Sequence, residues 1–253
     1  MAQVKIVLII AFLSIVGLTK ANPNQVLLDS AATYYTKGEF EKAINSYEQV
    51  LKNGYESTDL YYNLGNAYYK SNKIPWAILN FERAAKLAPS DEDIKFNLEL
   101  ANTYIVDKIE VIPEFFLNSW ATSFVMVLST NEWALLSLLT FVIGLTLLLV
   151  FFLSGKVWAR KVSFWFGVLL LIVSLFTFNF SRKQKWIIQN EPNAIVITPS
   201  VVVKSAPSET GTELFLIHEG LKIKVTDNRG VWRQIKLSNG SKGWVKETDF
   251  IVI

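Results

Sequence analysis

The decapeptide YYNLGNAYYK, residues 61–70, belongs to a 34-residue repeat, which indicates the architecture of the amino-terminal part of the chain. A shift of 34 positions pairs Tyr34 with Tyr68 and Ala43 with Ala77. Aromatic residues therefore meet aromatic residues, and small residues meet small ones. A repeat of this length is typical of stacked helical hairpins.

The second copy of the repeat closely resembles the tetratricopeptide consensus. Gly65 and Ala77 are expected where two antiparallel helices approach, and Pro89 is expected to end the second helix because proline cannot continue one. We therefore predict tetratricopeptide repeats at residues 24–57 and 58–91.

A third helix is expected to begin at Asp91. Its Asn97 follows Asn63 by 34 residues, but Glu99 stands where the repeat has a small residue. We interpret this helix as a cap, because a terminal repeat must cover an exposed apolar face. The predicted all-α array with its cap spans residues 22–110.

The inner surface of such an array is a natural site for a partner protein. By analogy with the family, the predicted partner-binding groove is lined by Leu28, Tyr35, Tyr62, Asn66, Tyr69, Lys70 and Phe96. The alternative is that the tyrosines only pack between helices or rest at a membrane. Some tetratricopeptide domains grip a terminal carboxylate, but Leu28 and Ala32 stand where that mode needs Lys and Asn.

Composition argues against an enzyme. The chain has no cysteine and one histidine, His218, so disulfides, thiolate metal sites and the usual histidine relays are excluded. We expect no catalytic residue, no metal and no cofactor, and we expect His218 to be an ordinary surface residue. Residues 22–113 carry 9 Lys and Arg against 13 Asp and Glu, a net −4, which offers no basic face for nucleic acid.

Two uncharged runs predict a transmembrane hairpin. Residues 133–155 and 162–181 contain no charged side chain. A helix rises about 1.5 Å per residue, so each run is long enough to cross a hydrocarbon layer of about 30 Å. The short link at 156–161 holds three Lys or Arg and the twenty residues before Trp133 hold none, which predicts a cytoplasmic link.

Charge does not orient the second span, because Arg182, Lys183 and Lys185 match the link in number. A hairpin must return, however, so both termini are predicted to be periplasmic at a bacterial inner membrane. With no ionisable residue inside either run, an ion or proton pathway is not expected.

Two further segments bear on membrane placement. Residues 1–21 read as a signal peptide, with an uncleaved anchor helix as the alternative. Residues 111–130 carry apolar side chains at helical spacing and predict an amphipathic interfacial helix, with burial against the repeats as the alternative. Ser129 and Glu132 form a predicted capping box that starts the first span.

The last sixty residues predict a small all-β domain after a polar linker at 182–193. Short alternating runs separated by turn residues read as strands at 194–197, 201–204, 221–225, 231–237 and 243–245. Tight turns are predicted at 227–230 and 239–240.

The order of these runs, ending in Gly243-Trp244-Val245, resembles the bacterial SH3 family over residues 194–253. The resemblance implies an SH3-like barrel that binds peptides or cell-wall material. It makes Trp232 and Trp244 candidate contacts, although such tryptophans also occur as core residues.

Taken together, the repeats, the segment IPEFF at 112–116, the hairpin and the SH3-like region resemble the tetratricopeptide-bearing members of the Bacteroides aerotolerance family. The resemblance implies that the protein acts together with membrane proteins that carry von Willebrand factor A domains and with a MoxR-type ATPase. The implied role is assembly or envelope maintenance under stress. Two hypotheses follow: a periplasmic scaffold that binds a partner in the repeat groove, or an envelope tether whose barrel binds peptidoglycan.

Overall fold

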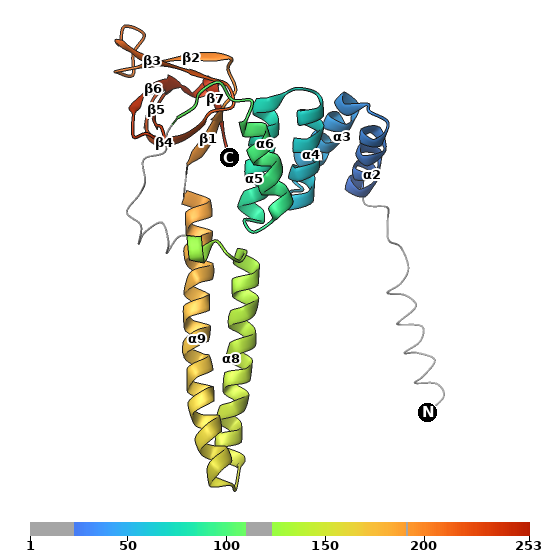
Figure 1. The fold of residues 1–253 in the computed structure, drawn as a ribbon, viewed down its shortest axis with the longest axis vertical. Helices are drawn as coiled ribbons and strands as arrows, with labels where there is room; N and C mark the ends of the chain where they lie inside the picture. The colour runs from blue at the N-terminus through green and yellow to red at the C-terminus, as the bar shows by residue number, and fades with distance from the viewer. Residues whose placement is uncertain (1–22, 110–122, 191) are drawn as a thin grey trace. The chain divides into compact units, whose positions relative to one another are not determined.

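The computed structural model describes residues 23–109, 123–190 and 192–253 (Figure 1). The predicted signal peptide at 1–21 lies outside these residues, as does most of the predicted interfacial segment at 111–130. The chain divides between Glu56 and Ser57 into two compact units, which are described separately. This division falls between the two predicted repeats.

The first unit contains a pair of packed helices, α2 (Pro23–Thr36) and α3 (Phe40–Lys52). Apolar residues of α3 recur on one face of the helix, and this face is buried in the packed pair. The buried apolar residues of the pair are Ala31, Ala43, Ile44, Tyr47 and Val50. The ring of Tyr35 meets Phe40 edge-on, with the ring centroids 5.4 Å apart.

The second unit begins with three helices, α4 (Thr58–Lys70), α5 (Ile74–Leu87) and α6 (Glu92–Asn102). The Ser57 hydroxyl accepts the Leu60 backbone N–H and so caps α4. The Asp91 carboxylate accepts the backbone N–H groups of Asp93 and Ile94 and so caps α6, which begins at Glu92, one residue after the predicted start.

Helix α5 packs against both α4 and α6. It ends at Leu87, two residues before Pro89, as the restriction that proline places on its preceding residue requires. Helices α4 and α5 pack tightly at Gly65, where an added Cβ would come within 2.6 Å of the Phe81 ring. The glycine of the repeat is therefore a packing requirement.

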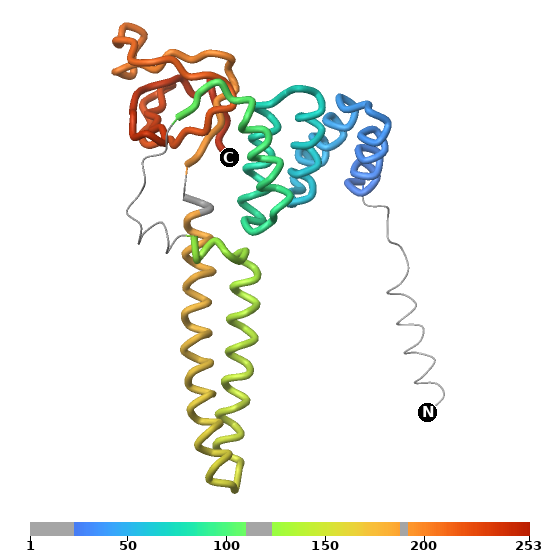
Figure 2. The backbone as a smooth tube through the Cα atoms, in the orientation of Figure 1, coloured from blue at the N-terminus to red at the C-terminus, as the bar shows by residue number. Residues whose placement is uncertain are grey.

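Two long helices follow, α8 (Thr130–Leu153) and α9 (Val157–Asn190), and they run side by side (Figure 2). The predicted capping box is confirmed: the Ser129 hydroxyl accepts the Glu132 N–H, and the Glu132 carboxylate accepts the Ser129 N–H. Both helices are long and apolar enough to cross a membrane. Only 11% and 22% of their most apolar windows is buried, whereas the core helix of a soluble protein is mostly buried.

The boundaries of α9 correct two predictions. Residues 157–161 of the predicted link belong to the helix, so the turn is limited to Ser154–Lys156. The predicted linker at 182–193 is helical as far as Asn190. The extension has a physical reason, because the Gln184 side chain is fully buried and its Nε2 donates to the Leu128 carbonyl at 2.7 Å.

Polar and small residues join α8 to α9. The Ser137 Oγ donates to the Ser174 carbonyl and the Ser174 Oγ donates to the Ser137 carbonyl, both at 2.9 Å. Further along, an added Cβ on Gly144 would lie 3.2 Å from the Gly167 carbonyl oxygen. Small residues that let two backbones approach, with hydroxyls bridging the helices, are typical of helix pairs in membranes.

The described end of the predicted interfacial segment is packed on this hairpin. Val125 is 2% exposed and its carbonyl accepts the Trp133 indole N–H at 2.9 Å. The Phe124 ring contacts the rings of Trp133 and Phe180 at centroid distances of 6.0 and 5.6 Å. Phe124 and Val127 nevertheless keep about half of their surface exposed.

The C-terminal part is one antiparallel sheet of seven strands in the order β3-β2-β6-β5-β4-β1-β7. The strands are β1 (Asn193–Val196), β2 (Ser200–Lys204), β3 (Glu213–His218), β4 (Lys222–Arg229), β5 (Trp232–Lys236), β6 (Lys242–Lys246) and β7 (Phe250–Val252). A 3-10 turn, Glu247–Asp249, precedes β7. The hydrophobic core of the sheet is formed by Ala194, Val196, Val201, Val203, Ile217, Leu221, Ile223, Ile235, Leu237, Val245 and Phe250.

The sheet has two strands that the sequence did not predict. In β3, Leu214 and Leu216 are about half exposed while Ile217 is 2% exposed, so apolar residues lie on both faces and hide the alternation. β7 is too short to give a pattern. The first predicted turn is also narrower than expected, because β4 continues to Arg229 and only Gly230 and Val231 form the turn.

The prediction that His218 is an ordinary surface residue is wrong. The His218 ring Nδ1 lies 2.9 Å from one Asp107 carboxylate oxygen, and the His218 backbone N–H donates to the other at 2.6 Å. Asp107 follows α6, so this pair joins the helical part of the second unit to the sheet. An ion pair of 2.7 Å between Glu82 of α5 and Lys222 of β4 makes a second junction.

Candidate partner-binding site

Four predicted groove residues lie along one helix of the second unit. Tyr62, Asn66 and Tyr69 of α4 are spaced by four and three residues, which places them on one helical face. All three are half-buried, whereas Lys70 at the end of the helix is exposed. The face therefore offers both aromatic surface and a free cationic end.

Asn97 of α6 connects this face to the next helix. Its side-chain amide donates to the Tyr62 hydroxyl at 2.8 Å and to the Asn66 Oδ1 at 3.1 Å. Tyr62 also packs on Phe81, with ring centroids 6.0 Å apart. Tyr62 therefore packs between helices, one of the alternatives that the sequence left open, and its hydroxyl accepts a hydrogen bond from Asn97; its role in partner binding stays a prediction.

Tyr69 is held by a second aromatic residue. Its hydroxyl donates to the Tyr104 hydroxyl at 3.2 Å, and the two rings meet edge-on at 5.8 Å. Because the Tyr69 hydroxyl donates in this bond, the bond raises the pKa of Tyr69. Tyr104 itself is 57% exposed, so the pair presents an ordered aromatic edge to solvent.

Helix α6 leaves apolar side chains uncovered. It buries Ile94 and Ala101 against its neighbours, but Phe96 is 66% exposed and Leu100 is 37% exposed. The capping helix therefore closes the array with a partly apolar outer face. A Phe with two thirds of its surface in water is available for a contact with another protein.

The remaining two predicted residues, Leu28 and Tyr35, lie on α2 of the first unit and are half-buried there. Within the second unit, Tyr62 and Asn66 are brought together by Asn97. Tyr69 is joined to Tyr104. We call the exposed surface of Tyr62, Asn66, Tyr69, Lys70, Phe96, Asn97 and Tyr104 the α4/α6 face.

Asn97 and Tyr104 were not predicted as site residues. For Asn97 a signal existed, because it repeats Asn63 after 34 positions. For Tyr104 there was none, since it lies beyond the end of α6 at Asn102 and its role depends on the position of Tyr69.

The sheet carries the second candidate site, around Trp232 and Trp244. The two tryptophans are 8% and 6% exposed, and neither belongs to the core cluster of the sheet. Cations cover them: the Lys246 Nζ lies 5.7 Å from the centre of the Trp232 ring, and the Arg229 guanidinium lies 5.7 Å from that of Trp244. Direct contact of a ligand with these rings requires the cations to move.

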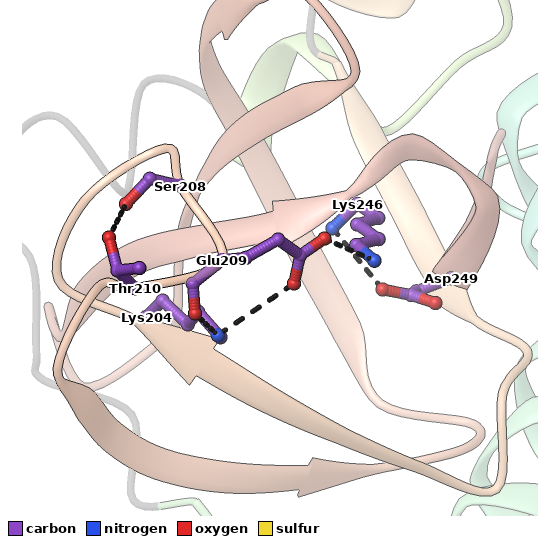
Figure 3. Close-up of polar contacts among 6 residues, drawn as sticks. All are labelled: Lys204, Ser208, Glu209, Thr210, Lys246 and Asp249. Atoms are coloured by element: carbon purple, nitrogen blue, oxygen red, sulfur yellow. Dashed lines mark hydrogen bonds and ion pairs between the residues drawn. The ribbon is translucent and has the colours of Figure 1, made fainter.

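The Glu209 carboxylate lies between Lys246, which covers Trp232, and Lys204 (Figure 3). The Glu209 carboxylate lies 2.7 Å from the Lys246 Nζ and 3.9 Å from the Lys204 Nζ. In the sheet register, Lys204 of β2 lies opposite Trp244 of β6. The hydrogen bond to Lys246 lowers the pKa of Glu209, and the same bond raises the pKa of Lys246.

Comparison with known proteins identifies the helical repeats. Residues 32–72 match the family model described as TPR repeat, and residues 58–91 match the one described as Tetratricopeptide repeat. No curated protein matches the chain. The predicted repeats are therefore confirmed as tetratricopeptide repeats, a class of domain that generally binds partner proteins.

Proposed function

We propose that this protein is a membrane-anchored scaffold that binds a partner protein through the α4/α6 face. The observation that carries the proposal is the combination of tetratricopeptide repeats with an ordered set of half-buried and exposed aromatic and amide side chains on and next to α4 and α6. Phe96 is the most exposed aromatic residue of this face. Aromatic residues are enriched among those that carry most of the energy in protein interfaces. No enzymatic activity is part of the proposal.

The anchor is the α8/α9 hairpin, whose turn we place in the cytoplasm with both ends of the chain on the periplasmic side of a bacterial inner membrane. Two apolar helices of sufficient length support the anchor. Lys156, Arg160 and Lys161 at the turn support the orientation, because cytoplasmic loops carry an excess of Lys and Arg.

The proposed partner class rests on the resemblance of nearly the whole chain to BatE, the tetratricopeptide member of the Bacteroides aerotolerance proteins. We propose membrane proteins with von Willebrand factor A domains, working with a MoxR-type ATPase in a complex linked to oxygen or stress tolerance. In this arrangement the sheet folds as an SH3-like barrel beside the repeats, an arrangement that its seven strands around one apolar core support.

The test is a cross-linked pull-down from intact membranes with a double variant, Tyr69→Ala with Phe96→Ala. These two side chains are half-buried and exposed, so their loss leaves the helix core intact. We expect the recovery of proteins with von Willebrand factor A domains to fall at least about tenfold, since truncating interface anchors costs about 2 kcal/mol or more.

The matched control truncates exposed side chains elsewhere, Tyr55→Ala with Val231→Ala, which are 41% and 64% exposed. It should recover partners as the unmodified protein does. Equal recovery by the α4/α6 variant and this control would show that the α4/α6 face does not bind these partners.

A second candidate function, envelope tethering through the sheet, is supported by the position of Trp232 and Trp244 outside the core cluster. In this hypothesis the sheet binds peptidoglycan after the covering cations move aside. The detergent-solubilised full chain should then sediment with purified peptidoglycan, and Trp244→Ala should abolish sedimentation. Absence of sedimentation by the unmodified chain rejects this function and leaves the scaffold proposal intact.

A further inference from the structure

A cavity of about 320 Å³ lies at the turn of the hairpin, where α8 ends and α9 begins. It is lined by Phe151, Val157, Arg160, Lys161, Phe164 and Trp165. Two of these side chains are cationic and the other four are apolar. A ligand that suits this lining combines an apolar part with an anionic group.

The lining residues of α9 share one face. Val157, Lys161 and Trp165 are spaced by four residues, and Arg160 and Phe164 fall between them at the same interval. Val157 begins α9 at the turn, Arg160 and Lys161 follow it after three and four residues, and Phe164 and Trp165 lie one helical turn further into the apolar run. The cations therefore lie next to aromatic side chains on the side of the middle of the hairpin.

The cation of the cavity is held by aromatic contacts. The Arg160 guanidinium lies 5.3 Å from the centre of the Phe151 ring, and Phe151 packs on Phe164 at 5.3 Å. A guanidinium over an aromatic face keeps its in-plane N–H groups available as donors. Such a planar set of donors matches the paired oxygens of a phosphate group.

The charge of this end of the hairpin is not balanced within the hairpin. No Asp or Glu occurs between Glu132 and Glu191, while Lys156, Arg160 and Lys161 all cluster at the turn. These cations therefore attract an anion from outside the hairpin.

The location selects the kind of anion. Arg160 and Lys161 directly precede the uncharged residues 162–181, a helical length of about 30 Å that matches the hydrocarbon thickness. This places the two cations at the level of lipid headgroups. Trp165, 70% exposed, lies at the depth where amphipathic rings meet the upper acyl chains.

We propose that this cavity binds one anionic phospholipid, with Arg160 and Lys161 donating to the headgroup phosphate and an acyl chain lying along Phe164 and Trp165. Basic pockets beside transmembrane helices are suited to anionic headgroups. The inference rests on the proposed membrane anchoring of the hairpin, which is tested separately below.

The chain offers a matched control for this site. Arg160-Lys161 and Arg182-Lys183 are the same dipeptide at opposite ends of α9, and Arg182 and Lys183 are exposed and do not line the cavity. The variants R160Q/K161Q and R182Q/K183Q therefore remove the same charge from the same helix. Native mass spectrometry of the full chain in detergent would count bound phosphatidylglycerol, with phosphatidylcholine as the neutral probe.

We expect one retained phosphatidylglycerol on the unmodified chain and a loss of about tenfold in its apparent affinity in R160Q/K161Q. R182Q/K183Q should stay within about twofold of the unmodified chain. Phosphatidylcholine should bind all three proteins equally weakly.

Equal losses in both double variants would overturn the proposal, because they would indicate diffuse attraction to a cationic protein. Unchanged binding in R160Q/K161Q would overturn it as well. Competition by millimolar glycerol phosphate, which lacks acyl chains, would assign the site to a free phosphate instead. Extraction of the same proteins with alkaline carbonate tests anchoring on its own. Release of the unmodified chain would reject the anchor and with it the lipid site, whereas loss of the lipid site alone would leave the anchor intact.

Discussion

Gly65 illustrates how strongly one residue constrains the repeat. An added Cβ would lie 2.6 Å from Cε1 and 2.7 Å from Cδ1 of Phe81, and Phe81 is only 1% exposed and therefore fixed in place. Gly65→Ala should destabilise the α4/α5 pair, because overpacking costs about 1–3 kcal/mol while alanine gains only about 1 kcal/mol in helix propensity. The effect is measured as the urea concentration at which half of the repeats in the solubilised chain become sensitive to protease. This midpoint should fall in Gly65→Ala.

Phe81→Leu supplies the control for this prediction, since the smaller side chain leaves room for the added methyl group. In that background Gly65→Ala should be neutral or stabilising. An equal loss of stability in both backgrounds would mean that the Phe81 contact is not the cause.

Glu209 provides a prediction for pH. Lys246 holds the pKa of Glu209 below 4.5, and Glu209 holds the pKa of Lys246 above 10.5. A lowered carboxyl pKa stabilises the native loop above pH 4.5, and this stabilisation is lost as the pH falls through the lowered pKa. The raised pKa of Lys246 acts in the opposite sense. Its contribution to stability is complete below pH 10.5 and is lost as the pH rises through the raised pKa.

The contact between Glu209 and Lys246 should therefore persist across the neutral range and open only in acid below pH 4.5 or in base above pH 10.5. An NMR titration of the Glu209 carboxyl carbon checks the acid side. In Lys246→Met the midpoint should move up toward 4.5. A midpoint that is the same with and without Lys246 would contradict the pairing.

At the scale of elements, the α8/α9 pair is defined by small residues and hydroxyls rather than by an apolar core. The Ser137 and Ser174 hydroxyl oxygens lie 3.2 Å apart. The natural chain has no cysteine, so introduced cysteines react without background. The variant Ser137→Cys with Ser174→Cys should form an intramolecular disulfide under mild oxidation. Because cysteines in a disulfide do not react with a maleimide, the electrophoretic mobility shift after maleimide labelling should decrease.

The control pairs Ser137→Cys with Leu175→Cys. Leu175 is the next residue of α9 and is 63% exposed, whereas Ser174 is 6% exposed and in hydrogen-bond contact with Ser137, so the Leu175 pair should form the bond in much lower yield. Adding Gly144→Ile to the reactive pair should lower its yield, because an added Cβ at Gly144 would lie 3.1 Å from Leu171 and push the helices apart. Equal yields for both cysteine pairs would refute the observed packing of α8 on α9.

At the scale of the whole molecule, the proposed hairpin sets which parts of the chain share a compartment. The repeats before α8 and the sheet after α9 should both lie outside the cytoplasm, with the turn Ser154–Lys156 inside. Reporter fusions after Lys108 and after Ile253 should show the same extracytoplasmic activity, whereas an insertion after Gly155 should show cytoplasmic activity. Opposite activities at Lys108 and Ile253 would exclude a hairpin.

Much of the architecture could be predicted from the sequence, because it depends on neighbouring residues. The 34-residue repeat, the uncharged runs and the capping box of Ser129 with Glu132 are all local patterns, since helix packing, partition into lipid and capping each act within a short window. Leu28, Tyr35, Tyr62, Asn66, Tyr69, Lys70 and Phe96 came from the analogy with the tetratricopeptide family, and their role as one groove stays a prediction.

Only the tertiary structure decided the features that join distant residues. Helix α9 continues to Asn190 where the sequence predicted a linker, with Gln184 binding the Leu128 carbonyl 56 residues earlier in the chain. His218 contacts Asp107, which lies 111 residues earlier in the chain. Strand β3 pairs with β2 although its sequence lacks a regular alternation of apolar and polar residues. Such contacts depend on which surfaces meet after folding. A pattern read along the chain carries no information about them, since the partners are neither neighbours nor periodic.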